Sequence, residues 1–344
     1  MNNDFTVIIP SIKISEVINN TLINCLKIKG LEKIIVAIDN NHDSKKKIIH
    51  PKIDYLYCEP GMNMSKKRNL AAKKSTTKYL LFYDSDSWPK NSGCAESAKS
   101  ILEKTQDIYA LGGPDISPPN QSFWKDVVSR LNLSFLISGF RNHRKTISKA
   151  GYKKELSSSN LLMEKNKYFE MNGMDEKLYD AEDTDLFNRI LNKGNKLYYD
   201  PNFLAFHMDR TLIGHIIQRY VRAAQSATAT KKFFHKKIKK LKITPGEYRY
   251  EYLITPIYSI YLMFYIFMKL KFTSFIFFSI IDVPIILALI IIFIDSIRIS
   301  KISNILHIFL LLNLIALIQS FGSFFSYFGL RLAIKKIYRN ENDK

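Results

Sequence analysis

Two acidic clusters carry the side chains most capable of chemistry, and the first is Asp84-Ser85-Asp86. It follows the apolar run 79–83 and stands shortly before Pro89. Alternate side chains of an extended segment point the same way, so Asp84 and Asp86 can converge on one hard cation. Such a cation could hold a nucleotide diphosphate and neutralise the charge that develops as it leaves. The ordinary alternative is a hydrogen-bonded turn after a strand.

The second cluster places four acids between residues 180 and 185. Apolar residues at 186, 187, 190 and 191 predict a helix, with Gly194 at its C-terminal cap. Glu182 and Asp183 then stand at the helix start, where capping explains one or two acids. Crowded like charges raise one another's pKa, which makes a carboxylate usable as a general base near neutral pH.

Alternating strand and helix patterns must position these clusters. We expect strands at 5–9, 33–38, 53–57 and 79–83, with helices at 15–28 and 65–74. This order predicts an α/β fold with a mostly parallel sheet, in which ligands bind at the carboxyl ends of the strands.

The order of the motifs resembles that of the family 2 glycosyltransferases, which have the GT-A fold, a nucleotide-binding sandwich. The resemblance covers roughly residues 4–230. It rests on segments 6–10, 34–41, 61–71, 84–86, 111–114, 159–163, 169–178, 182–186 and 199–207. Each motif is weakly specific, and their shared order makes the match strong.

The resemblance implies an inverting sugar transfer. Asp183 would be the catalytic base, beside Glu182. The metal, Mg²⁺ or Mn²⁺, would be held by Asp84, Asp86 and His207, although a hydrogen-bonded core histidine is an equal alternative for His207. The other residues expected to contact the nucleotide-sugar are Pro10, Asp39, Asn40, Arg68, Asn69 and Ser85. Those expected on the acceptor side are Gly113, Asn160, Asp185, Arg219 and Arg222.

Several positions depart from the family pattern. Asn41-His42 replaces the usual Gly-Ser after the second strand, which leaves the nucleotide base open, and Gly173-Met174 replaces Gly-Gly or Gly-Phe. The segment 218–222 partly matches the Gln-x-x-Arg-Trp element of processive synthases but lacks the Trp. Arg219 and Arg222, on a helix expected at 211–231, would contact phosphate or lipid headgroups, or be plain surface charge.

The C-terminal third has the composition of a membrane protein. Three apolar segments, 252–268, 272–294 and 302–330, are candidate transmembrane helices, and the first could instead lie in the interface. Two or three spans therefore stay open, as does the side of the basic tail at 331–344. Asp282 would have to face a partner helix or the bilayer interface. The net charge of +20 and the basic run 231–242 favour anionic membrane lipids as partners.

The expected domains are a catalytic domain (1–210), a basic interfacial segment (211–250), the transmembrane helices (251–330) and the tail. The N-terminus lacks an export signal, which predicts a multi-pass cell-membrane protein with its catalytic domain on the cytoplasmic side. The acceptor would then be lipid-linked, of the polyprenyl-phosphate type, with recognition by residues 115–154, in the synthesis of a surface polysaccharide. Rivals are a noncatalytic scaffold of the same fold and a processive synthase.

Other classes fit less well. Nucleic-acid binding lacks a helix-turn-helix, zinc or RNP pattern, and a transporter needs more spans. The three cysteines are odd in number and show no CxxC spacing, so neither a disulfide framework nor a zinc site is indicated.

Overall fold

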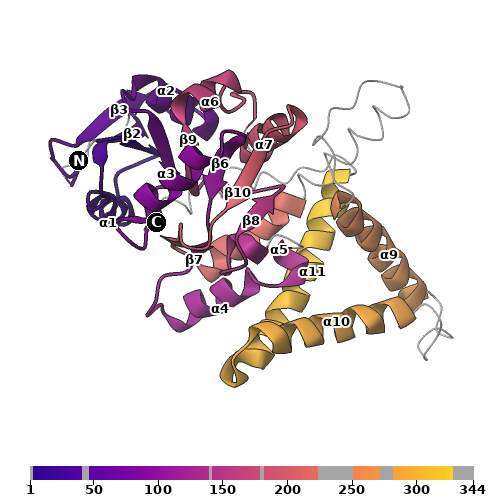
Figure 1. Cartoon of the computed structure of the whole chain (residues 1–344). Coiled ribbons are helices and arrows are strands. Elements are labelled where there is room, and N and C mark those ends of the chain that lie inside the picture. The colour runs from indigo at the N-terminus through magenta and orange to yellow at the C-terminus, as the bar shows by residue number, and fades with distance from the viewer. Residues whose placement is uncertain are drawn as a thin grey trace. The chain divides into compact units, whose positions relative to one another are not determined.

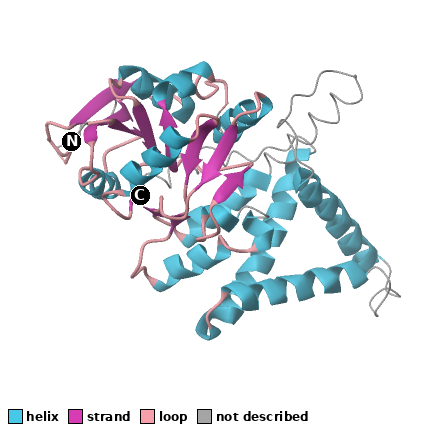
Figure 2. Ribbon diagram, viewed as in Figure 1, coloured by secondary structure: helices cyan, strands magenta, loops and turns pink. Residues whose placement is uncertain are grey.

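The computed structural model describes residues 3–40, 46–138, 142–178, 182–223, 251–271 and 282–327. Figures 1 and 2 show its helices and strands. Its contacts divide the chain into two units. Unit 1 comprises residues 1–119 and 141–208, and unit 2 comprises residues 120–140 and 209–344. Residues 120–140 thus group with the C-terminal helices, while the expected domain limits stay a prediction.

The large sheet of unit 1 has eight strands in the order β3-β2-β1-β4-β9-β6-β10-β8. Its strands are β1 (Phe5–Ser11), β2 (Leu31–Asp39), β3 (Ile53–Cys58), β4 (Tyr79–Tyr83), β6 (Ile108–Gly112), β8 (Gly151–Lys153), β9 (Asn160–Glu164) and β10 (Lys196–Tyr199). The strands β3, β2, β1 and β4 are parallel to one another, and β10 is parallel to β6. β9 and β8 run antiparallel to their neighbours. The expected mostly parallel α/β sheet is confirmed.

Successive side chains of a strand lie on opposite faces of the sheet, and each face packs against its own layer of helices. In β1, Val7 and Ile9 belong to one buried cluster and Ile8 to the other. The first cluster includes α1 (Glu16–Cys25) and α3 (Cys94–Lys104). The second includes α2 (Met64–Lys74), α6 (Lys165–Glu170) and α7 (Glu182–Asn192). Apolar residues on both faces explain the nearly continuous apolar runs of β1, β2 and β4.

A second, three-stranded sheet in the order β5-β11-β7 gathers three distant segments. β11 (Ala205–His207) pairs antiparallel with β5 (Ser87–Pro89) and parallel with β7 (Asp115–Ile116). His207 is therefore opposite Ser87, and Ala205 is opposite Asp115.

The predicted elements of unit 1 are confirmed with small shifts at their ends. The helix expected at 15–28 ends at Cys25, and the faint segment 115–154 contains β7, β8, α4 (Phe123–Leu131), α5 (Phe135–Ser138) and the 3-10 turn η1 (Asn142–Arg144). The helix expected at 211–231 is described over 212–223. The basic run 231–242 and the tail 331–344 lie outside the described residues.

Unit 2 contains α4, α5, the helix at 212–223, α9 (Glu251–Lys271), α10 (Val283–Ile299), the turn η4 (Ile302–Asn304) and α11 (Ile305–Tyr327). Side chains from α4, α10 and α11 form its apolar cluster, which includes Val127, Leu131, Ile292 and Ile308. α11 lies against both α9 and α10.

Of the expected span at 272–294, the structure describes residues 282–294. α10 begins at Val283, with Asp282 as its N-cap and Pro284 in its first turn, and ends at Ile299. The Asp282 carboxylate accepts hydrogen bonds from the Tyr265 hydroxyl at 2.9 Å and from Lys269 Nζ at 3.0 Å. Asp282 thus faces a partner helix, as expected. Among the described residues, one helix, Ile302–Ser326, is long and apolar enough to cross a membrane, with a mean hydropathy of 2.0.

Gly113 supports a prediction about folding. A Cβ at this position would lie 1.7 Å from the backbone oxygen of Phe203, whereas a Cβ at Gly93 meets nothing within 4 Å. We expect Gly113→Ala to destabilise the protein by about 3 kcal/mol, the upper end for overpacking, because the obstacle is backbone. Gly93→Ala should unfold like the wild type in thermal denaturation of the full-length protein. Equal midpoints for the two variants would contradict the packing described here.

Candidate active site

The buried guanidinium of Arg68, on α2, joins the two acidic clusters. Its Nη2 lies 2.6 Å from Asp84 Oδ1 and its Nη1 lies 2.7 Å from Glu182 Oε1. Arg68 is 3% exposed. Burial alone lowers the pKa of Arg68, but the charges of Asp84 and Glu182 outweigh it and the pKa is raised. One cation therefore holds the end of β4 against the start of α7.

Asp183 lies at the start of α7 beside a second cation. Its Oδ1 accepts a hydrogen bond from the backbone N–H of Thr184 at 2.7 Å. Its Oδ2 lies 3.7 Å from Nη2 of Arg144, and its side chain is 15% exposed. Burial raises the pKa of the neighbouring Glu182 against the charge of Arg68. Arg68 therefore binds Glu182, and Asp183 lies beside Arg144.

Asp84, Asp86 and His207 form a group that can hold a divalent cation. One ligand atom from each lies within 4.8 Å of the other two. His207 Nε2 is 3.3 Å from Asp86 Oδ1. Two carboxylates and an imidazole suit Mn²⁺ and, through the oxygens, Mg²⁺. The chemistry of the side chains therefore fits the expected metal, and the small sheet brings them together by pairing His207 with Ser87.

The end of β2 carries a second buried ion pair. Asp39 Oδ1 is 2.6 Å from Lys67 Nζ, and Asp39 Oδ2 accepts a hydrogen bond from the Gly61 backbone at 3.3 Å. Lys67 also donates to the Ser11 carbonyl at 2.5 Å, directly after Pro10. Asn40 is exposed, and its backbone N–H donates to Cys58. These residues line up along the carboxyl ends of β1, β2 and β3.

Two expected contact residues, Asn69 and Asp185, make contacts within the protein. The Asn69 amide donates to the Met174 carbonyl at 2.8 Å and to Glu176 at 3.0 Å, and its oxygen accepts from Tyr168. Asp185 pairs with Arg189 at 2.7 Å. Arg189 in turn donates to the Gly173 carbonyl at 2.8 Å. Both residues therefore shape the loop that precedes α7.

Gly113 and Asn160, two residues expected to contact the sugar acceptor, instead pack against the backbone at Phe203. The Asn160 amide donates to the carbonyls of Phe203 at 2.6 Å and Pro114 at 3.3 Å. The other two, Arg219 and Arg222, belong to unit 2. Arg219 is buried and donates to the Ile137 carbonyl at 3.4 Å, whereas Arg222 is exposed.

Three charged residues of the site were not singled out by the sequence: Lys67, Asp115 and Lys145. Asp115 lies beside His207, with its Oδ1 3.1 Å from Lys145 Nζ. Burial would raise the pKa of Asp115, but Lys145 and His207 hold it well below its usual value. Sequence signals existed for two of them, because Asp115 follows the motif 111–114 and Lys145 follows the basic segment 141–144.

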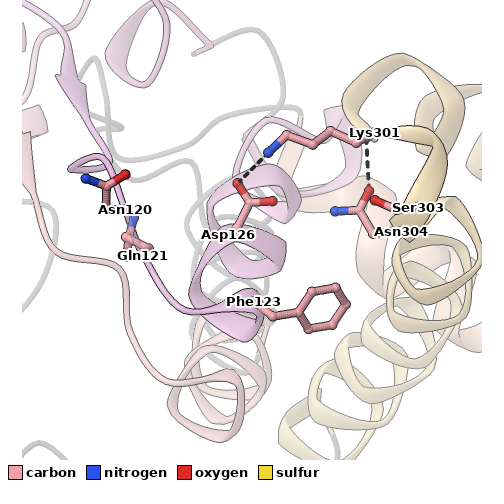
Figure 3. A pocket seen from close by; sticks show the side chains of 7 residues that line it. All are labelled: Asn120, Gln121, Phe123, Asp126, Lys301, Ser303 and Asn304. Carbon is pink, nitrogen blue, oxygen red and sulfur yellow. Dashed lines mark hydrogen bonds and ion pairs between the residues drawn. The ribbon is translucent and has the colours of Figure 1, made fainter.

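Unit 2 contains a separate hollow of about 360 Å³, shown in Figure 3. It is lined by Asn120, Gln121, Phe123, Asp126, Lys301, Ser303 and Asn304. Lys301 reaches Asp126 at 3.8 Å, and its backbone N–H donates to Asn304. None of the expected site residues lines this hollow.

A comparison with known protein families finds a match that includes the first acidic cluster. The family model "Glycosyl transferase family 2" matches residues 6–163, which include Arg68, Asp84 and Asp86. Over these residues, slightly less than half of the chain, the protein is similar to the family 2 glycosyltransferases. The match supports a transferase that uses a nucleotide-sugar donor. A search of curated proteins found no match.

Several solved glycosyltransferases resemble the chain, each at 14% identity. GalNAc-T7 with UDP, GalNAc and Mn²⁺ has a TM-score of 0.47 over 65% of this chain and 50% of its own. The mannosyltransferase PcManGT of Pyrobaculum calidifontis, with GDP-Man and Mn²⁺, has a TM-score of 0.49 over 70% and 66%. TarS of S. aureus has a TM-score of 0.44 over 65% and 39%. The chain thus spans between about two fifths and two thirds of these proteins.

Arg68 generates a prediction about stability. Arg68→Met should cost about 3 kcal/mol of unfolding free energy, near the low end for a broken buried pair, because Asp84 is one-third exposed. Adding Glu182→Gln should restore part of the loss by removing one of the uncompensated charges. Urea denaturation of both variants measures this.

A matched control is Lys196→Met, which breaks the half-exposed pair with Asp107 and should change stability by about 1 kcal/mol or less. If Arg68→Met were no more harmful than this control, Arg68 would not be the link between the clusters.

Proposed function

We propose that the chain is an inverting, metal-dependent glycosyltransferase that moves a hexosyl group from a nucleotide-sugar to a lipid-linked acceptor at the membrane. The observation that carries the proposal is the Arg68 bridge, which sets the acids after β4 beside the acids that begin α7. A donor-binding cluster and a candidate base thereby face one site.

In this proposal, the carboxyl ends of the strands bind the donor. Asp39, fixed by Lys67, lies at the end of β2, where it would accept hydrogen bonds from the base or ribose. Asn40 and Pro10 would complete the wall. Asp84, Asp86 and His207 would hold Mg²⁺ or Mn²⁺, which supplies positive charge to the departing nucleoside diphosphate.

Asp183 is the proposed base. Its carboxylate would take the proton of the acceptor hydroxyl as that oxygen bonds to the anomeric carbon. The bond to the nucleoside diphosphate breaks on the opposite face, and the configuration inverts. Arg144, 3.7 Å away, places a positive charge beside this carboxylate. Asp185 fits this role less well because Arg189 occupies it.

The lipid-linked acceptor and the membrane location rest on the C-terminal helices. The segment Ile302–Ser326 can span a bilayer by length and composition, and 28% of its most apolar window is buried within the protein. α10 exposes further large apolar side chains, among them Leu287, Ile291 and Ile294. We infer a multi-pass membrane protein with the catalytic unit on the cytoplasmic side. There it would have access both to nucleotide-sugars and to polyprenyl-phosphate-linked acceptors, and the transfer would belong to the synthesis of a surface polysaccharide.

Replacing Asp183 tests the catalytic part of the proposal. Asp183→Asn should lower kcat by about 10²- to 10⁴-fold, because general base catalysis contributes that much, while nucleoside diphosphate binding stays intact. Release of nucleoside diphosphate is measured with UDP-, GDP- and dTDP-sugars, a divalent metal and a membrane lipid extract. Asp107→Asn, outside the site, is the control. Full activity of Asp183→Asn would reject this base.

The acceptor is tested in the same assay by comparing soluble sugars with polyprenyl-phosphate-linked ones in detergent. Stimulation by the lipid-linked compounds alone supports the proposal. Transfer to soluble acceptors only would reject the lipid-linked class while leaving the transferase in place.

Metal removal gives an independent prediction. Chelation by EDTA should abolish release, and Mn²⁺ or Mg²⁺ added in excess should restore it, because Asp84 and Asp86 otherwise face the diphosphate as like charges. Activity that persists in EDTA after dialysis would show that the acids act without a cation.

A further inference from the structure

The imidazole of His207 lies between two carboxylates of different exposure. Nε2 is 3.3 Å from Asp86 Oδ1, and Nδ1 is 3.3 Å from Asp115 Oδ2. The Asp86 side chain is 36% exposed, whereas that of Asp115 is 2% exposed. An ion entering from solvent can therefore reach the Nε2 side of the ring, and the Nδ1 side faces the interior.

The position of Asp115 is fixed by neighbours other than His207. The hydroxyls of Ser157 and Ser159 both donate to its Oδ2, the first at 3.1 Å. The strand β7 that carries it pairs with β11, which carries His207. These bonds hold Oδ2 of Asp115 beside the ring as an acceptor.

A neutral imidazole has one N–H donor and one acceptor nitrogen. If the proton is on Nδ1, it is donated to Asp115, and the lone pair of Nε2 points toward the Asp86 side. Lys145 favours the opposite tautomer. Its Nζ lies 3.4 Å from Nδ1 of His207 and can donate to that nitrogen only when the ring proton is on Nε2. A proton on Nε2 prevents that nitrogen from binding a metal ion.

We propose that Asp115 is a positioning residue that selects the metal-binding tautomer of His207, and that Lys145 opposes it. The proposal rests on the metal site of the proposed function. Ligating histidines commonly donate their second N–H to a carboxylate, which orients the ring and raises its basicity. Lys145 adds a fixed positive charge beside the ring, which further disfavours a bound cation.

The two residues therefore have opposite expected effects on Mn²⁺ binding. Asp115→Asn should weaken binding by about 10- to 100-fold, the usual effect of losing such a partner. Lys145→Met should tighten it by about fivefold, because a like charge and a competing donor are removed. Neither direction follows from a merely structural role.

The experiment titrates Mn²⁺ into the full-length purified protein and follows free Mn²⁺ by electron paramagnetic resonance. Pulsed measurements then detect the coupling of bound Mn²⁺ to an imidazole nitrogen. His207→Gln defines the spectrum without that nitrogen. Asp107→Asn, a carboxylate paired with Lys196 outside the site, controls for the loss of one acid.

Weakened binding with reduced nitrogen coupling in Asp115→Asn, and tightened binding in Lys145→Met, support the proposal. Wild-type affinity and coupling in folded Asp115→Asn overturn it. If Asp115→Asn does not fold, Lys145→Met decides: tighter binding supports the proposal, and unchanged or weaker binding overturns it. A wild-type protein that binds Mn²⁺ without nitrogen coupling removes His207 from the metal site, and the loss of transfer in Asp183→Asn still tests the transferase separately.

Discussion

The site depends on a buried positive charge. Arg68 comes from α2, yet its guanidinium binds Asp84 after β4 and Glu182 at the start of α7, so three separate segments meet at one side chain. Without that cation the two carboxylates would repel each other in a poorly solvated place. The planar guanidinium has donors in a fork that can serve two acids at once, which a lysine cannot do in the same geometry. The distance between Asp84 and the start of α7 follows from this bridge.

The small sheet is the second element on which the site is built. It consists of short pieces, β5, β7 and β11, whose ladder sets the order Asp86, His207, Asp115 across three segments. Acidic and nitrogen-bearing side chains alternate there: carboxylate, imidazole, carboxylate and then Lys145. Each carboxylate therefore has a nitrogen partner from another segment.

Charged residues of the apolar C-terminal helices are also satisfied inside unit 2. Asp295 on α10 accepts from Ser134 Oγ at 2.6 Å and from the Phe135 backbone at 2.9 Å, and it pairs with Arg298. Asp295 thus meets the N-terminal end of α5, and Arg130 of α4 donates to the Ile299 carbonyl. These bonds explain why residues 120–140 group with the C-terminal helices although they lie within the catalytic sequence. Apolar side chains of α10 and α11 remain exposed.

The sequence by itself determined the strands at 5–9, 33–38, 53–57 and 79–83 and the two acidic clusters, because apolar runs and acids at strand ends are local signals. His207 entered the metal group only through the family resemblance, with a core histidine as an equal alternative. It also indicated that Asp282 needs a partner. It could not separate residues that face a ligand from those that face the protein. Asn69, Asp185, Gly113 and Asn160 lie in family motifs, yet their polar atoms or backbone are used within the fold. Lys67, Asp115 and Lys145 acquire their meaning from partners distant in the chain. Only tertiary structure decides such pairings, because a buried charge is placed by whichever opposite charge the fold brings beside it.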